Sequence, residues 1–197
     1  MTEAANGAVT TPSAVRRLDG AEATKLAGLA AVFEDLQYVL RCCEHLVTAL
    51  ATPQPDTALV EALWTGALIG YVRCFSGRAG VLSDDDLGKL ELDGDVREFH
   101  GMVKKLRDHY ASRHVNPRES FTIGAAQSND GRPTGVAVVS APRPLVDDTT
   151  VRLLGRVAYA LSGLVDARMQ AMQARVLAAA GALTPAQLAA LPLVHLS

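Results

Sequence analysis

The chain has 197 residues, 49% of them apolar and only 5% aromatic, and its formal net charge is −2. This length fits one domain that can bury a core without disulfides or a structural metal, and a core of Ala, Leu and Val favours packed helices. No segment approaches the roughly 18 consecutive apolar residues of a membrane span, and residues 1–12 lack the features of a signal peptide. We therefore expect a cytoplasmic protein with no membrane partner. The near-neutral charge gives no overall attraction to nucleic acid.

The first third of the sequence predicts an arm and then a long helix. Residues 1–18 mix small and polar types without periodicity, which is typical of a flexible arm. We expect 19–197 to form a single helical domain with a β-hairpin. Over 20–51, apolar residues recur at spacings of three and four, as they do along the buried face of a helix.

A second helix is predicted over 57–76, with Asp56 as its N-cap. Its surface is apolar almost all round, which indicates burial on most sides. Gly66 and Gly70 lie four residues apart, so they would allow a neighbouring helix to approach closely.

The rest of the sequence predicts two long helices with a hairpin between them, and a short element before and after this group. A short acidic turn after Ser83 precedes a helix over about 94–115, and turn-forming residues separate two strands at 120–127 and 134–141. The last two helices are expected over about 147–180 and from 185 to about 191. We therefore predict a mainly α protein, an antiparallel four-helix-type bundle with a β-hairpin inserted at about 120–141.

The charges of the middle segment are separated along the chain. Residues 83–98 hold seven acids against two bases, and residues 99–118 hold five bases against one acid. One interpretation is two solvated surfaces that attract each other, and the other is a local basic face on a nearly neutral protein.

The usual signals of metal, redox and nucleotide chemistry are missing. Three adjacent carboxylates, Asp84–Asp86, are explained by the positive end of a short helix better than by a cation site. Cys42, Cys43 and Cys74 form no Cys-x-x-Cys pair, so we expect them to be small buried side chains. The sequence predicts no metal site and no cofactor.

One stripe of the helix at 94–115 carries the residues with chemical potential. His100, Arg107 and His114 are spaced by seven, which is nearly two full turns, so a continuous helix would place them on one face with Lys104 between them. A histidine that titrates near neutrality can move protons, and a guanidinium can hold a phosphate as charge develops.

The segment from Leu106 to Asn116 resembles the element of HEPN nucleases, an arginine, a polar residue and, a few positions later, a histidine near a helix end in a four-helix bundle. Here these are Arg107, Asp108 and His114, and the helix segment 67–75 is similar to the one that packs beside it in related proteins. Many relatives place the histidine one residue earlier, in the position that Arg113 holds here.

This resemblance implies a metal-independent ribonuclease, active or degenerate, of the kind found among RNA-processing and toxin proteins. Its catalytic residues would be Arg107, Asp108 and His114, in a site that two copies of the chain complete as a homodimer. The nearby cations His100, Lys104, Arg113 and Arg73 would then bind RNA.

Structural roles for the same residues stay open. Arg107, Asp108 and His114 could cap and cross-link the end of a helix, where cations are favourable. Arg73 lies in an apolar helix and needs a carboxylate such as Asp108 or Glu44. The alternative function is a non-catalytic, homodimeric interaction module whose hairpin edge binds a protein partner.

Overall fold

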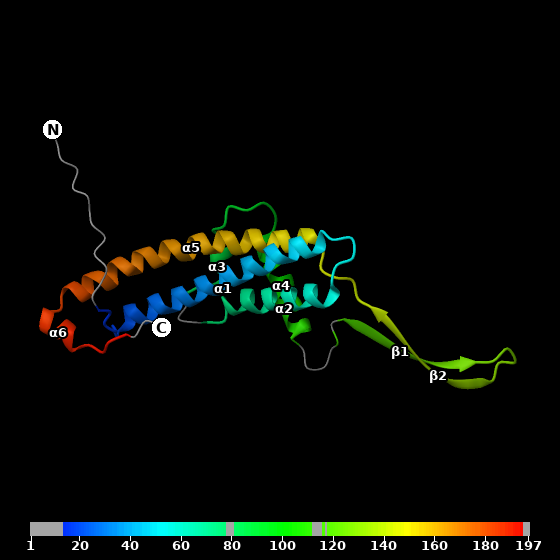
Figure 1. The fold of residues 1–197 in the computed structure, drawn as a ribbon. Helices are drawn as coiled ribbons and strands as arrows, with labels where there is room; N and C mark the ends of the chain where they lie inside the picture. Colours follow the sequence, from blue (N-terminus) through cyan, green and yellow to red (C-terminus); the bar gives the residue numbers. More distant parts are fainter. Residues whose placement is uncertain (1–13, 78–80, 112–115, 117, 195–197) are drawn as a thin grey trace.

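The computed structural model describes residues 14–77, 81–111, 116 and 118–194. Along the chain, a long helix is followed by three shorter ones, a β-hairpin, a second long helix and a final short one (Figure 1). The elements are α1 (Ala21–Leu50), α2 (Thr57–Arg73), α3 (Asp84–Leu87), α4 (Val96–Tyr110), β1 (Glu119–Gln127), β2 (Pro133–Pro142), α5 (Asp148–Gly181) and α6 (Pro185–Ala190).

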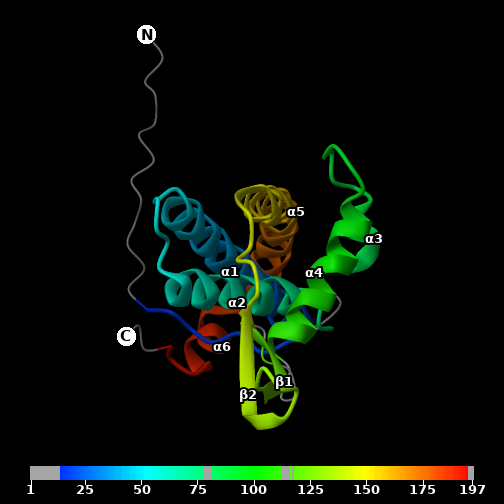
Figure 2. The ribbon, with the colours of Figure 1, turned by 90° about the vertical axis from the view of Figure 1, so that its right-hand side faces the viewer.

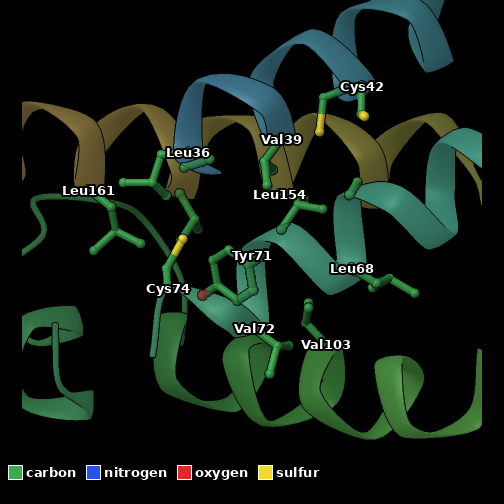
Figure 3. Close-up of a cluster of buried hydrophobic side chains, with 14 of the residues drawn as sticks. Leu36, Val39, Cys42, Leu68, Tyr71, Val72, Cys74, Val103, Leu154 and Leu161 are labelled. Atoms are coloured by element: carbon green, nitrogen blue, oxygen red, sulfur yellow. The ribbon is translucent and has the colours of Figure 1, made fainter. Parts of the chain in front are cut away.

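The helical body is built around α1. This helix packs along α5 and also along α2, and α4 packs against α2. Buried side chains from α1, α2, α4 and α5 meet in one core. Figure 3 shows part of it, in which Leu36, Val39 and Leu154 lie near Tyr71. The mainly helical fold with one hairpin is confirmed, and the antiparallel four-helix-type bundle stays a prediction.

Aspartate caps fix where three of the helices begin. The Asp56 carboxylate accepts hydrogen bonds from the amides of Ala58 and Leu59, at 3.0 and 3.2 Å. Asp95 and Asp147 accept in the same way at the starts of α4 and α5, each at 2.8 Å. Such caps satisfy amides that have no partner within the helix, typically contributing about 1 kcal/mol each.

Two helix ends differ from the predicted ones. Helix α2 ends at Arg73 and not at 76, and α4 spans Val96–Tyr110 and not 94–115. Ala111 follows α4 as its C-cap and donates its amide to the carbonyl of Arg107, at 2.9 Å. Apolar periodicity located the middle of α4, where Phe99 and Val103 are buried, but it placed the C-terminal end of the helix beyond Tyr110.

The close approach predicted for the second helix is present. A Cβ added to Gly70 would lie 3.1 Å from Cγ2 of Val39, and one added to Gly66 would lie 2.7 Å from the hydroxyl of Tyr38. Both neighbours belong to α1, so the two glycines allow α1 and α2 to pack at short range.

The hairpin projects from the helical body (Figures 1 and 2). Its strands pair antiparallel from Glu119 opposite Pro142 to Gln127 opposite Pro133, with a bulge next to Gln127. None of the helices that the structure describes packs along these strands. Most of the side chains of both strands are consequently exposed.

The two ends of the described chain meet. The amide of Arg17 donates to the carbonyl of Pro192 at 2.8 Å, and that of Val194 donates to the carbonyl of Val15 at 2.9 Å. The predicted arm therefore ends in a short paired segment, and its residues 1–13 lie outside the described part. Among the helices described, none has the length and apolar character to cross a bilayer.

Candidate functional site

The residues predicted to carry chemistry are spread over two helices. His100, Lys104, Arg107 and Asp108 lie on α4, and Arg73 is the last residue of α2. Arg113 and His114 lie outside the described residues. Because α4 ends at Tyr110 and Ala111 is its C-cap, the predicted continuous helix that would carry His114 to the face of Arg107 is wrong.

His100 does not lie on an open cationic face. Its exposed fraction is 3%, and its ring packs against Phe75 with centroids 4.5 Å apart. Its Nδ1 lies 3.0 Å from the hydroxyl oxygen of Tyr71. The reason is packing, since the neighbouring Phe99 and Val103 turn this side of α4 toward the core. The prediction that His100 belongs to a stripe separate from the apolar side of this helix is therefore wrong.

The second ring nitrogen of His100 faces the start of α3. Nε2 lies 3.4 Å from Oδ1 of Asp84, which is ion-pair range, but the geometry makes no hydrogen bond. Burial lowers the pKa of His100, against the opposing effect of Asp84 and with the help of Lys104. The imidazole is therefore neutral at pH 7.

Two ion pairs join α3 to α4, and the one between Lys104 and Asp84 links the basic segment 99–118 to the acidic segment 83–98. Nζ of Lys104 lies 4.0 Å from Oδ2 of Asp84, and Nη2 of Arg97 lies 3.9 Å from Oδ1 of Asp85. Both pairs join α4 to α3 at the surface, where each is worth at most about 1 kcal/mol.

Arg107 and Asp108 are brought together at the last turn of α4. Nε of Arg107 lies 3.2 Å from Oδ1 of Asp108, whose side chain is mostly exposed. That nitrogen is buried and makes no hydrogen bond with any of the described residues. These contacts suit a local ion pair at a helix end, and the guanidinium would have to release Asp108 to hold a phosphate.

Arg73 has a partner that the sequence did not indicate. Its guanidinium holds the carboxylate of Asp35 on α1 with two contacts, Nε to Oδ2 at 3.0 Å and Nη2 to Oδ1 at 2.8 Å. The predicted partners, Asp108 and Glu44, are wrong. The fork-to-carboxylate geometry fixes the end of α2 against α1.

The sequence did not predict that Asp86 would be a buried carboxylate with several hydrogen-bond donors. Asp86, only 3% exposed, accepts two hydrogen bonds from Arg168 at 2.6 and 3.1 Å, one from Lys89 at 2.8 Å and one from the amide of Ser83 at 3.0 Å. Burial would raise the pKa of this carboxyl, but the hydrogen bonds outweigh it and hold the pKa well below its ordinary value. Arg168 is 82 residues away in the sequence, so only the Ser83-to-Asp86 capping pattern gave a local signal.

The base of the hairpin is tied to the body by a second missed contact. Nη1 of Arg118 lies 2.9 Å from Oε1 of Glu61 on α2. A cavity of about 200 Å³ lies beside this pair, lined also by Trp64, Tyr110 and Arg143. The first residues of the hairpin are thus anchored although its strands are not.

Metal and thiol chemistry have no support in the described part of the chain. No three His, Cys, Asp or Glu side chains there gather in a way that would hold a metal ion. Cys42, Cys43 and Cys74 are buried, as predicted. Burial raises the pKa of the Cys43 thiol to about 12, so it is a poor nucleophile.

No protein-family model matches the chain, and no curated protein and no solved structure shows significant similarity to it.

Proposed function

We propose that the chain is a non-catalytic protein-interaction module that forms a homodimer through its hairpin, with the helices as an antiparallel bundle-type support. The observation that carries this proposal is an apolar hairpin face that nothing in the described chain covers. Four large side chains of this face are 56–77% exposed: Phe121, Ile123, Val136 and Val138.

The strand register places these side chains together. Ile123 lies opposite Val138, and Ala125 lies opposite Val136. Residues two apart on a strand point to the same side, so Phe121 joins this set, while Thr122 and Val139 belong to the other face. We call the side with Phe121, Ile123 and Val138 the apolar face.

A hairpin of two strands is only marginally stable alone in water, and proteins usually cover or charge such exposed strands. Between residues 120 and 127 and between 133 and 142 there is no charged residue. The hairpin therefore lacks the ordinary protection against association, which favours a partner.

A second copy of the chain is the partner that fits best. Two uncharged apolar faces can stack about a two-fold axis without like-charge repulsion, and such an interface uses the same patch twice. The four side chains offer roughly 400 Å² per chain, about half of what a standard interface buries on each side. The expected dimer is consequently reversible, with a dissociation constant in the micromolar range.

Sedimentation at several protein concentrations tests this dimer. Wild type should dimerise between about 1 and 100 µM, and the double variant Ile123→Thr/Val138→Thr should remain monomeric, because threonine keeps strand propensity but adds hydroxyls to the face. The matched control Ala137→Thr/Val139→Thr alters the other face and should dimerise like wild type. A monomeric wild type at all concentrations, or equal loss in both variants, would contradict the proposal.

A second candidate is the HEPN-like RNase suggested by the sequence, active or degenerate, acting on RNA. The observation that favours it is the Arg107–Asp108 pair at the end of α4, in the segment 99–118 that is rich in Lys and Arg. Lys104 and Arg73, two of the proposed RNA contacts, already face Asp84 and Asp35. Because these two side chains already have carboxylate partners, fewer cations are free to bind the phosphates of RNA.

Cleavage of RNA in the presence of EDTA tests the second candidate. An active enzyme would leave cyclic phosphate ends, and Arg107→Ala and His114→Ala would each abolish the products. Lys105→Ala, an exposed cation on the same helix, is the control. If wild type and His114→Ala leave the same negligible cleavage, the chain is not an active nuclease.

A further inference from the structure

A hollow lies between α1, the segment 81–89 and α5. Its volume is about 540 Å³, within the roughly 300–1,000 Å³ of small-molecule sites. Leu29, Val81 and Met172 give it apolar walls. The basic side chains that line it come from all three elements: Lys25, Lys89, Arg168 and Arg175.

Helical spacing explains why the two long helices face this hollow with these residues. On α1, Lys25 and Leu29 are four apart, and on α5, Arg168, Met172 and Arg175 follow at intervals of four and three. Residues at such intervals lie on one side of a helix. Each helix thus presents a cation next to an apolar side chain.

One edge of the hollow is rigid and carries excess positive charge. Arg168 holds Asp86 with two hydrogen bonds and also donates to the carbonyl of Val81. Lys89 donates to the same carboxylate at 2.8 Å, with most of its side chain exposed. Two cations therefore share one carboxylate, and the ammonium of Lys89 keeps donors for another acceptor.

The other two cations add to this excess. Lys25 and Arg175 are exposed, and no carboxylate of the described residues pairs with either of them. The second carboxylate in the hollow, Asp85, lies 3.9 Å from Arg97. In a chain whose net charge is −2, this place is locally positive.

We propose that the hollow binds a small organic anion in which a phosphate or carboxylate group adjoins an apolar group. The anionic group would lie among Lys25, Lys89 and Arg175, and the apolar group against Leu29 and Met172. Charge-assisted hydrogen bonds supply the attraction to the anionic end, and the apolar walls select against simple inorganic ions. This inference does not depend on the hairpin.

Titration with the fluorescent dye 8-anilinonaphthalene-1-sulfonate, an aromatic anion, tests the site. The dye should bind saturably at one site per chain, and Lys25→Gln/Arg175→Gln should weaken it at least fivefold. Lys105→Gln/Arg132→Gln removes the same charge from exposed residues that do not line the hollow, and it should change binding by less than twofold. Displacement by phenyl phosphate identifies a phosphate-type head, and displacement by benzoate a carboxylate-type one.

Three results would overturn the proposal. The first is that neither competitor displaces the dye, and the second is that both charge-removing double variants weaken dye binding equally. The third is loss of the dye signal in Ile123→Thr/Val138→Thr, which would show that the dye binds the hairpin. The substituted cations are exposed and carry no cap or core contact, so all variants should fold, and circular dichroism checks this directly.

Discussion

The hydroxyl oxygen of Tyr71 and Nδ1 of His100 lie 3.0 Å apart in the buried contact between α2 and α4. Burial raises the pKa of Tyr71, so the phenol keeps the proton that it can donate. The carboxylate of Asp84 can only accept, which favours the ring proton on Nε2 and leaves Nδ1 to accept from the Tyr71 hydroxyl. Tyr71 on one side and Asp84 on the other thus favour one tautomer and one orientation of this buried histidine.

Removing this hydroxyl should destabilise the fold. Tyr71→Phe keeps the ring but leaves Nδ1 buried without its donor, which should lower the free energy of unfolding by about 1–3 kcal/mol. Urea denaturation followed by circular dichroism measures the change. Tyr159→Phe removes a hydroxyl from a residue that is 74% exposed and should leave stability unaltered. Equal effects of the two substitutions would mean that the contact contributes nothing.

The stability of the protein should fall on mild acidification because of His100. Burial lowers its pKa in the folded state below the ordinary value of 6.5, with Asp84 opposing. As the pH drops through 6.5, the unfolded chain takes up the proton first, so the stabilising contribution, complete above this pH, is progressively lost. The slope for one proton is at most about 1.4 kcal/mol per pH unit. Urea titrations between pH 8 and 5.5 measure it.

Two variants check the assignment to His100. Asp84→Asn removes the charge that opposes the shift, so the loss of stability should become larger below pH 6.5. His45→Gln changes an exposed histidine and should keep the wild-type slope. Asp86 does not interfere, because its pKa is already held below its ordinary value of 3.8. A flat profile in wild type would show that His100 takes up its proton equally in both states.

Local patterns in the sequence located the helices and the hairpin well. Capping aspartates, apolar spacing and turn residues act over a few positions, which is why Asp56, the Gly66 and Gly70 pair and both strands were predicted correctly. The extent of α4 was not, because no signal before Asn116 marked its end at Tyr110. All of these predictions, correct or wrong, concern where helices and strands begin and end and how closely they pack.

The partners of charged side chains could not be predicted in the same way. Asp35 and Arg73 meet through the packing of α1 on α2, and Asp86 and Arg168 meet across most of the chain. Helical periodicity predicts which residues of α4 lie on the same side, but it did not predict that the side with His100 would pack against the core. Tertiary contacts decide these points, and one sequence does not contain their geometry.

Breaking the ion pair between Arg168 and Asp86 from one side should be strongly destabilising. Arg168→Gln leaves a carboxylate that is 3% exposed with fewer donors. Breaking a buried pair from one side costs about 3 kcal/mol or more, and Lys89 should keep the loss near the lower end of that range. Arg97→Gln, which removes a partner 3.9 Å from the exposed Asp85, should cost under about 0.5 kcal/mol.

Chemical denaturation of single and double variants separates this pair from its surroundings. Asp86→Asn/Arg168→Gln should be clearly more stable than the sum of the two single losses predicts, because the second substitution removes a charge that the first left unpaired. Simple additivity would mean that the two groups act independently, contrary to the bidentate geometry.

Glycine substitutions can measure how closely α1 and α2 approach. Alanine gains helix propensity over glycine by about 0.8–1 kcal/mol at any interior helical position. At Gly101 of α4 a Cβ would meet nothing within 4 Å, so Gly101→Ala should be stabilising by about that amount. At Gly70 the same Cβ would lie 3.1 Å from Cγ2 of Val39 and 3.3 Å from Cδ1 of Tyr38, which forces α1 to shift. Gly70→Ala should therefore be at least about 1 kcal/mol less stable than Gly101→Ala in thermal or urea unfolding. Since propensity is common to both, an equal gain at the two positions would show that the helices are not in close contact there.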